Sequence, residues 1–589
     1  MGAVENIIAD NLPIWSSAVQ SKSSARRGAS SKRKLYGVKK LRELILDLAV
    51  RGLLVPQDLN DAPTSVLVNK IAAEREQRIN AGTMKKPKEL NTITDEEKIF
   101  NVPNTWTYHR LGEIATIIRG ITFPASEKSQ ISATGRVACI RTTNVQDRIE
   151  WDDLLFIRTE YVKREDQYLL QGDIVISMAN SRELVGKVAL VSTPPATKSS
   201  FGGFLAVIRT KGFSPDFLMY QLRSTAIRQN LIDSASQTTN IANISMGKLN
   251  PLVIGVPPLA EQHRIVAKVD ELMALCDTLE QQQEDSIQAH ETLVEALLEA
   301  LTSAVDADAF QDAWQRISEY FDVLFTTEHS IDKLKETILQ LAVMGKLVPQ
   351  DPSDEPASVL LEKISIEKKK LVTEGKIKKS KTLGPITDKD LPFVLPSGWS
   401  WCRLPEIGEL ARGKSKHRPR NDPSLYSGGD IPLVQTGDVA RASKIINTYS
   451  SLYNQKGLSQ SRMWPAGTMC ITIAANIADS GLLGFDACFP DSVVGFIPLG
   501  CQLDVRYFEY FLRTAKANLE KFAPSTAQKN INLEILGSLL VPLPPQQELN
   551  RIIAKIDQLM ALCDQLKESL QQAQQTQIHL TDAVVGNAL

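Results

Sequence analysis

The chain has 589 residues, of which 43% are hydrophobic and 23% charged, enough for about three to five globular domains. No apolar run approaches the roughly 20 residues that span a membrane, the N-terminus lacks a secretory signal pattern, and seven cysteines without a CxxC pair argue against a disulfide framework or zinc ribbon. The formal net charge of −1 means that nucleic acid would have to be bound by local basic surfaces, and we expect a cytoplasmic protein.

The first predicted elements are a basic segment, residues 22–40, and a helix that begins at Leu41. Serines and glycines surround the basic residues of the segment, which favours a solvated linker. The helix is expected to end at Gly52, where a C-cap glycine and then a proline stop it. The block that starts at Leu41 is LRELILDLAVRGLLVPQDLNDAPTSVLVNKI, and a similar block, LKETILQLAVMGKLVPQDPSDEPASVLLEKI, starts at Leu334. Gly345 of the second block matches Gly52 of the first.

A second pair of matched blocks shows that the chain contains two copies of one plan. PPLAEQHRIVAKVDELMALCD starts at Pro257, and PPQQELNRIIAKIDQLMALCD starts at Pro544. Their apolar residues step by four and three, which is typical of a coiled-coil seam, and the first block predicts a helix of about 40 residues, on the order of 60 Å long. The predicted spacer and docking residues are Ile265, Val269, Leu272, Cys276, Leu279, Ile552, Ile556, Leu559, Cys563 and Leu566.

The cysteine of each MALCD phrase occupies a seam position among leucine, methionine and isoleucine. No histidine or second cysteine stands at the spacing of a metal ligand. A buried thiol packs as a small hydrophobic group, and burial makes it less reactive because its pKa rises. We therefore interpret both cysteines as packing residues, with a metal or redox site as the alternative.

Two dissimilar segments lie between the matched blocks, and we call them module one (residues 105–256) and module two (residues 398–543). Runs rich in Val, Ile and Thr alternate with Gly, Pro, Asn and Asp turns, which predicts mixed β-rich domains. The predicted fold class is α+β: two similar β-rich modules separated by long helices that form an antiparallel coiled coil, with an internal pseudo-two-fold duplication. The remaining domains are expected to be helical: residues 1–104 with the basic tail, the central residues 257–397, and the C-terminal residues 544–589.

Signatures of catalysis are missing from the sequence. It contains no HExxH, no GxSxG, no GxGxxG after a strand, no Asn/Asp-Pro-Pro-aromatic motif and no convincing nuclease cluster. Residues 408–415, GELARGKS, satisfy the phosphate-binding pattern GxxxxGKS/T. The prolines in the following KHRPRNDPSLYSGG block the helix that would cradle a phosphate, so a basic DNA-facing loop is favoured.

The repeated helical phrase, alternating with dissimilar β-rich modules, closely resembles the specificity subunits of type I restriction-modification enzymes. The resemblance covers nearly the whole chain from about Leu41. It implies a non-catalytic DNA-reading subunit: each module is a target recognition domain for one half of an asymmetric, bipartite site, and the helices set a nonspecific spacer and dock two modification subunits.

The resemblance also implies where the chemistry of the complex lies. This chain is expected to bind no cofactor or metal and no membrane. The modification subunits would use S-adenosylmethionine to methylate adenine, and two motor-nuclease restriction subunits would use ATP with Mg for restriction.

Base edges are read by Arg, Asn, Gln, Ser and Thr, and phosphates are contacted by Lys and Arg. We therefore select polar residues at equivalent turns of both modules as candidate DNA contacts, with an ordinary solvated loop as the alternative for each. Module one contributes Arg119, Arg141, Thr142, Thr143, Asn144, Asn180, Ser181, Arg182, Lys198, Thr238, Thr239 and Asn240. Module two contributes Arg412, Lys414, Lys416, Arg418, Arg420, Gln435, Thr436, Asn476, Gln528, Lys529 and Asn530.

Two other function classes fit parts of the sequence. A coiled-coil scaffold that binds only proteins explains the heptads, but it gives no reason for two divergent, polar-lined modules. Salt-dependent binding to duplex DNA separates that scaffold from a DNA reader. A stand-alone nucleotide-driven enzyme rests on residues 408–415 alone, and it would be supported by a Lys414→Ala variant that loses nucleotide binding.

Overall fold

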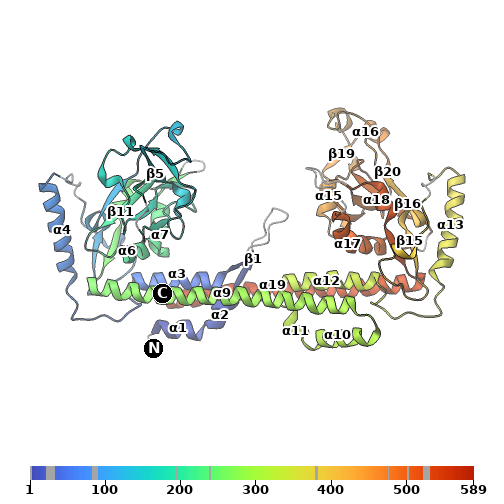
Figure 1. Cartoon of the computed structure of the whole chain (residues 1–589), viewed down its shortest axis with the longest axis horizontal. Helices are drawn as coiled ribbons and strands as arrows, with labels where there is room; N and C mark the ends of the chain where they lie inside the picture. Colours follow the sequence, from blue (N-terminus) through green and yellow to red (C-terminus); the bar gives the residue numbers. More distant parts are fainter. Residues whose placement is uncertain are drawn as a thin grey trace. The chain divides into compact units, whose positions relative to one another are not determined.

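The computed structural model describes residues 3–21, 33–82, 86, 90–193, 197–237, 241–378, 383–474, 477–500, 503–521 and 531–589. The chain forms two compact units: unit 1 comprises Met1–Ser286 and Ala573–Leu589, and unit 2 comprises Ile287–Gln572. No helix in these described ranges is long and apolar enough to cross a membrane. Each unit combines β-sheets with helices, which confirms the predicted α+β class (Figure 1).

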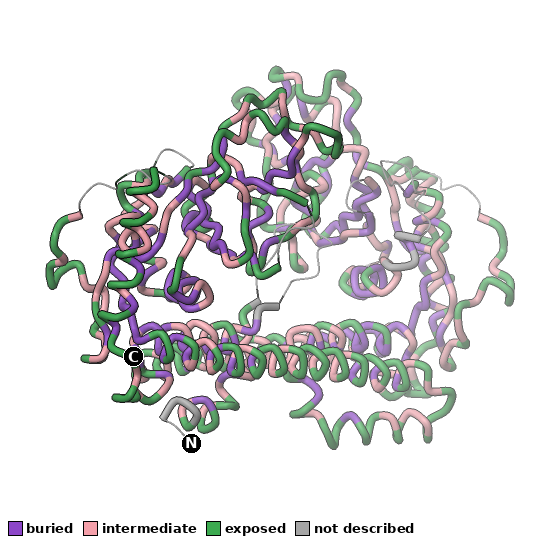
Figure 2. Tube along the Cα trace, turned by 60° about the vertical axis from the view of Figure 1, so that its left-hand side comes forward, coloured by how far each residue is buried: buried purple, intermediate pink, exposed green. Residues whose placement is uncertain are grey.

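The β-rich part of unit 1 begins and ends in a short antiparallel ribbon, in which β3 (Thr107–Arg110) pairs with β14 (Val253–Val256). The main sheet is antiparallel in the order β4–β11–β7–β9, with bounds Ala115–Arg119, Leu205–Thr210, Ile174–Ser177 and Val188–Leu190. Every residue of β7 is buried, so this strand is covered on both faces. Its unbroken apolar run in the sequence follows from that burial. Figure 2 shows buried segments gathered in the interior of the β-rich parts, with exposed segments outside them.

Two smaller sheets and two helices complete module one. In the sheet β10–β5–β6, β10 runs parallel to β5, whereas β6 runs antiparallel to it. The third sheet has the order β12–β13–β8 and is antiparallel. Their bounds are Ser199–Phe201 (β10), Arg136–Ile140 (β5), Leu155–Arg158 (β6), Ser236–Gln237 (β12), Ala242–Asn243 (β13) and Ala179–Asn180 (β8), and the helices are α6 (Pro215–Arg223) and α7 (Thr225–Ser234).

Module two, in unit 2, has the same entry ribbon and a main sheet of five strands instead of four. Its ribbon pairs β15 (Ser400–Arg403) with β25 (Leu540–Leu543). The main sheet β16–β24–β21–β22–β18 spans Gly408–Arg412, Val493–Pro498, Met469–Thr472, Ser480–Leu483 and Ile445–Ile446. The second sheet β19–β17–β23–β20 spans Ser451–Tyr453, Ile431–Leu433, Ala487–Cys488 and Met463–Trp464, and helix α17 (Val505–Lys521) follows β24.

The two longest helices carry the repeated MALCD phrase. They are α9 (Leu259–Ser303), with 45 residues, and α19 (Gln546–Ala588), with 43 residues. Helix α9 begins in unit 1 and ends in unit 2, whereas α19 begins in unit 2 and ends in unit 1, so the two helices run in opposite senses between the units. In unit 1, Arg42 of α3 (Tyr36–Val50) pairs with Asp277 of α9 at 2.6 Å.

The predicted seam residues lie mainly on the covered sides of these helices. In unit 2, Cys563 belongs to an apolar cluster with residues of α12 (Glu328–Val343) and the end of α9. The buried seam residues are Ile265, Val269, Leu272, Cys276, Ile552, Ile556 and Cys563. The half-buried ones are Leu279, Leu559 and Leu566.

Glycines end the first helix of each repeated block, as the sequence predicted. Gly52 follows α3 with φ 71°, and Gly345 follows α12 with φ 69°, the left-handed conformation that favours glycine. The second helix of each block is α4 (Thr64–Asn80) in unit 1 and α13 (Ala357–Thr373) in unit 2.

Each unit also contains a pair of short helices before the first helix of its repeated block. Helices α1 (Ala3–Asp10) and α2 (Leu12–Ser17) precede α3, and α10 (Ala307–Glu319) and α11 (Phe321–Leu324) precede α12. Trp15 of α2 is fully buried, and Gly37 of α3 lies directly against its backbone carbonyl. The sequence did not predict these four helices.

Candidate nucleic-acid interface

In module one, the predicted polar turns of Arg141 and Asn180 and the turn after Arg119, a candidate phosphate contact, meet around the loop Gly202–Phe204, which joins β10 to β11; we call this loop the central turn of module one. The N–H of Gly202 donates to the carbonyl of Ile140, the residue before Arg141, at 3.0 Å. The carbonyl of Phe204 accepts the N–H of Met178, two residues before Asn180, at 2.8 Å. The N–H of Gly120, the residue after Arg119, donates to the carbonyl of Leu205 at 3.1 Å. Backbone hydrogen bonds therefore bring the three turns together.

Close backbone packing fixes the position of this central turn. A Cβ atom on Gly120 would overlap the carbonyl oxygens of Gly202 and Phe201. Glycine is required there because the two backbones touch directly. The placement of the polar turns therefore follows from the β-sheet framework.

Module two repeats this arrangement, with Pro490–Ser492 as its central turn. The N–H of Gly413 donates to the carbonyl of Val493, the first residue of β24, at 2.9 Å. The N–H of Val434, the residue before Gln435, donates to the carbonyl of Cys488 at the end of β23, also at 2.9 Å. The N–H of Ile473 donates to the Ser492 carbonyl at 3.0 Å. The two modules therefore share a set of backbone hydrogen bonds around the central turn, which we call the backbone hub, but they carry different side chains on it.

The candidate residues of module one mostly present their side chains to solvent. The exposed ones are Arg119, Thr143, Ser181, Arg182 and Lys198, and the half-buried ones are Arg141, Thr142 and Asn180. Arg141 pairs with Asp153 at 2.7 Å, and Lys198 pairs with Glu165 at 3.1 Å. Surface ion pairs of this kind contribute little stability, so both cations remain available to an incoming phosphate.

Asn144 was selected as a base reader, which requires an accessible side chain, but its side chain faces into its own turn. Its side chain is buried, and its Oδ1 accepts the N–H three residues earlier at 2.9 Å. Its Nδ2 donates to the carbonyls of Glu150 at 3.0 Å and Asp152 at 2.9 Å. The amide therefore holds the turn together, as Asp438 does in module two by accepting the N–H of Gln435 at 2.8 Å.

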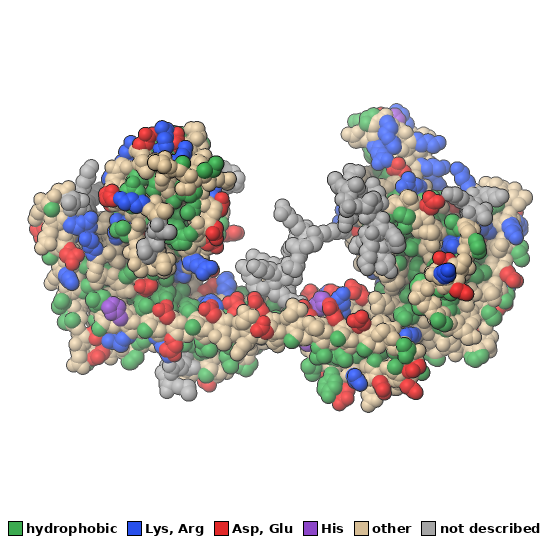
Figure 3. All heavy atoms as spheres, viewed as in Figure 1, with side chains coloured by type: hydrophobic (Ala, Val, Ile, Leu, Met, Phe, Trp, Pro, Cys, Tyr) green, Lys and Arg blue, Asp and Glu red, His purple; other side chains and the backbone are tan. Residues whose placement is uncertain are grey.

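A basic loop follows β16 in module two, where Figure 3 shows Lys and Arg side chains gathered on one end of the module. The exposed candidates of this part are Arg412, Lys414, Lys416, Arg418, Arg420 and Gln435, and Thr436 is half-buried. Asp491 of the central turn pairs with Arg420 at 2.6 Å and lies 3.9 Å from Arg418. No helix follows β16 over residues 413–422, so the geometry of a phosphate-binding loop is not formed there.

Some candidate residues cannot be placed. Thr238, Thr239, Asn240, Asn476, Gln528, Lys529 and Asn530 lie outside the described residues, as does most of the basic N-terminal segment.

Comparison with known proteins identifies the family. The family described as type I restriction modification DNA specificity domain matches residues 103–289 and 396–575. The chain belongs to this family of specificity subunits. The specificity subunit is 37% identical to the type I restriction enzyme EcoEI specificity subunit of Escherichia coli, with all of both chains covered. The EcoAI specificity subunit of the same species is also 37% identical with full coverage.

A chain from a solved structure, which concerns complex assembly of a type I R-M system, is 18% identical to this specificity subunit. The match covers 98% of that chain and 83% of this one, with a TM-score of 0.46.

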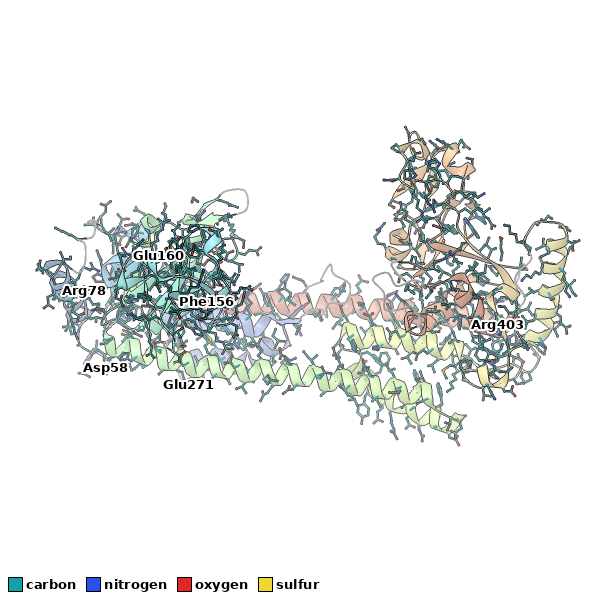
Figure 4. The ribbon with its side chains drawn as sticks, turned by 45° about the horizontal axis from the view of Figure 1, so that its top comes forward. Asp58, Arg78, Phe156, Glu160, Glu271 and Arg403 are labelled. Atoms are coloured by element: carbon teal, nitrogen blue, oxygen red, sulfur yellow. The ribbon has the colours of Figure 1, made fainter. Side chains whose placement is uncertain are left out.

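The specificity subunit anchors each module to its long helix through a repeated polar cluster, which we call the reader clamp. In unit 1, Glu261 of α9 accepts the Trp106 indole N–H at 2.9 Å and the Gln57 amide at 2.7 Å. Burial raises the pKa of the Glu261 carboxyl. Figure 4 labels Asp58, the neighbour of Gln57, and Glu271, which lies further along α9.

The clamp of unit 2 uses the matching residues of the second copy. Glu548 of α19 accepts the Trp399 indole N–H at 3.0 Å and the Gln350 amide at 3.3 Å, and burial again raises its pKa. The sequence showed these residues within repeated motifs, the glutamine in LVPQD and the glutamate after Pro-Pro, but gave no sign that they meet. Phe204 was also missed, since Gly-Gly-Phe has no counterpart in the second module.

The cysteines of the specificity subunit have the environment of packing residues. Burial raises the pKa of the Cys276 thiol to about 11 and also raises that of Cys563. Among the residues that the structure describes, no group of three or more His, Cys, Asp or Glu side chains could hold a metal ion.

Proposed function

We propose that modules one and two each bind one half of an asymmetric, bipartite site in double-stranded DNA. The observation that carries this proposal is the shared backbone hub. Both modules gather polar turns around a central turn in the same way, yet the side chains on those turns differ. Equal frameworks with unequal side chains suit two readers that recognise different base pairs. The proposed readers have the boundaries 105–256 and 398–543.

We further propose that the helical regions 1–104, 257–397 and 544–589 set a nonspecific spacer and dock two modification subunits. The duplicated helical blocks support two copies of one partner, because equal surfaces bind equal chains. In this proposal the partners carry the chemistry. The modification subunits use S-adenosylmethionine to methylate adenine, two restriction subunits use ATP with Mg, and this cytoplasmic chain binds no cofactor.

Methylome sequencing tests the proposal. The chain is expressed with its cognate modification subunit in cells that lack other DNA methyltransferases. We expect methylated adenine in one asymmetric motif whose two parts are separated by unspecified base pairs. A Gln435→Ala variant should relax one position of one half-site, at a cost of about 1–3 kcal/mol, and should leave the other half unchanged.

Two results would contradict the proposal. One is an uninterrupted motif, and the other is a Gln435→Ala variant that alters both halves. A chain that shows no salt-dependent binding to duplex DNA would instead favour a coiled-coil protein scaffold. Lys414→Ala serves as the control, since a phosphate contact should weaken binding to all sequences alike.

A further inference from the structure

Phe204 exposes an aromatic ring at the centre of the polar turns of module one. Its side chain is 67% exposed, although only two glycines separate Phe204 from the end of the buried strand β10. The backbone under the ring is fixed, because the Phe204 carbonyl accepts the Met178 N–H at 2.8 Å and the Gly202 N–H donates to Ile140 at 3.0 Å. The ring therefore stands at a defined place.

The neighbours of this ring are the candidate readers. The hydrogen bonds of the central turn lead directly to the turns of Arg119, Arg141 and Asn180. A single exposed apolar side chain is ordinary on a protein surface. An exposed phenyl ring on a loop whose backbone is bonded next to the turns of Arg141 and Asn180 is less so, because those turns carry side chains of the types that hydrogen-bond base edges. That combination matches a thymine, whose O4 acceptor and C5-methyl group lie side by side in the major groove.

Module two shows that this position varies while the backbone does not. Its equivalent of Phe204 is Ser492, whose carbonyl accepts the Ile473 N–H at 3.0 Å. The residue before it, Asp491, pairs with Arg420 at 2.6 Å. The same place on the framework thus carries an aromatic ring in one module and a small hydroxyl side chain, next to a charged residue, in the other. A position that changes chemistry on a constant framework is suited to set which base each module prefers.

We propose that Phe204 contacts the methyl group of a thymine in the half-site of module one and so determines specificity at that base pair. This inference rests on the proposed function, since it requires module one to read DNA. The ring buries the methyl group against its face, while neighbouring polar side chains bond the polar edges. Removing one buried methyl group from such a contact should weaken binding about fourfold.

The test uses the full chain with its modification subunits and duplexes that carry the recovered site. Each thymine of the site is replaced in turn by deoxyuridine, which lacks only the methyl group. The wild type should bind about fourfold more weakly at one thymine of one half-site. Phe204→Ala should bind the thymine and deoxyuridine duplexes equally at that position and keep its other preferences, and Phe204→Leu should retain part of the discrimination.

Ile131→Ala is the matched control, because Ile131 is another exposed apolar residue of module one, 74% exposed, outside the three polar turns. It should discriminate like the wild type. The proposal is overturned if Phe204→Ala weakens binding to every duplex alike. It is also overturned if the variant still binds the thymine duplex about fourfold more tightly than the deoxyuridine duplex at that position. If the wild type itself shows no sequence preference, the proposed DNA-reading function fails, and the inference fails with it.

Discussion

Replacing Asn144 by alanine separates a turn-holding role from a base-reading role. The buried side chain accepts the Arg141 N–H and donates to the carbonyls of Glu150 and Asp152, at 2.9–3.0 Å. Alanine would leave these three backbone groups without their partner. At about 1 kcal/mol for each lost hydrogen bond, the free energy of local unfolding should fall by about 2–4 kcal/mol.

Hydrogen exchange measured by mass spectrometry is the suitable assay, because the chain has two units and one global transition is not expected. Peptides over residues 136–158 should lose protection in Asn144→Ala, while peptides of module two should keep theirs. Thr143→Ala is the control, since Thr143 is exposed on the same turn and should change stability by less than about 0.5 kcal/mol. A fully protected Asn144→Ala protein whose preference changes at one base pair would refute this reasoning and make Asn144 a reader.

Other side chains and the long helices provide further tests. Removing four residues from the glutamine-rich middle of both α9 and α19 shortens each helix by about 6 Å, so methylome sequencing should report a spacer about one or two base pairs shorter; altered half-sites would rule out a helical ruler. Lys414→Ala should lower affinity for all sequences and reduce the slope of log affinity against log salt by about one in titrations, whereas a loss at a single base pair would make Lys414 a reader. Burial raises the folded-state pKa of Glu548, so the free energy of unfolding should fall as pH rises from about 4.3 through that pKa. Glu548→Gln should flatten this slope in hydrogen-exchange protection factors of peptides from unit 2, and an unchanged slope would contradict burial as its cause. Cys276→Ala and Cys563→Ala should each cost about 1 kcal/mol and leave base preference intact in a binding selection, and a changed preference would give the thiols a part in recognition.

Local patterns in the sequence predicted the elements that local forces determine. The stops at Gly52 and Gly345 are helix signals within a few residues, and both were correct. Strand partners were not predictable in this way. Strand β10 pairs in parallel with β5, about sixty residues earlier, and no short-range pattern encodes that register. The short helices α2 and α11 were missed, because they gain stability by packing, α2 on α3 and Leu324 of α11 against residues of α12, and no local pattern shows such contacts.

The candidate site was predicted in composition better than in orientation. Polar turns were found at equivalent places of both modules, and the structure brings those of Arg141 and Asn180 together in module one, beside the turn after Arg119. Whether one asparagine points toward DNA or into its own turn depends on distant backbone groups, such as those of Glu150 and Asp152 for Asn144. The reader clamp shows the same difficulty, since Gln57 and Glu261 are 204 residues apart in the chain.

The entry ribbons have a consequence for how this chain can change over time. Thr107 lies opposite Val256 in one module, and Ser400 lies opposite Leu543 in the other, so each module leaves and rejoins the helical framework at a single place. Each module also bonds to its long helix near the ribbon, through Tyr220 to Asp270 and through Arg506 to Asp557, whereas the sheets beyond can differ. The main sheet has four strands in module one and five in module two, and both modules close in the same way. A lineage could therefore exchange a whole module in one genetic event and inherit its helices unaltered.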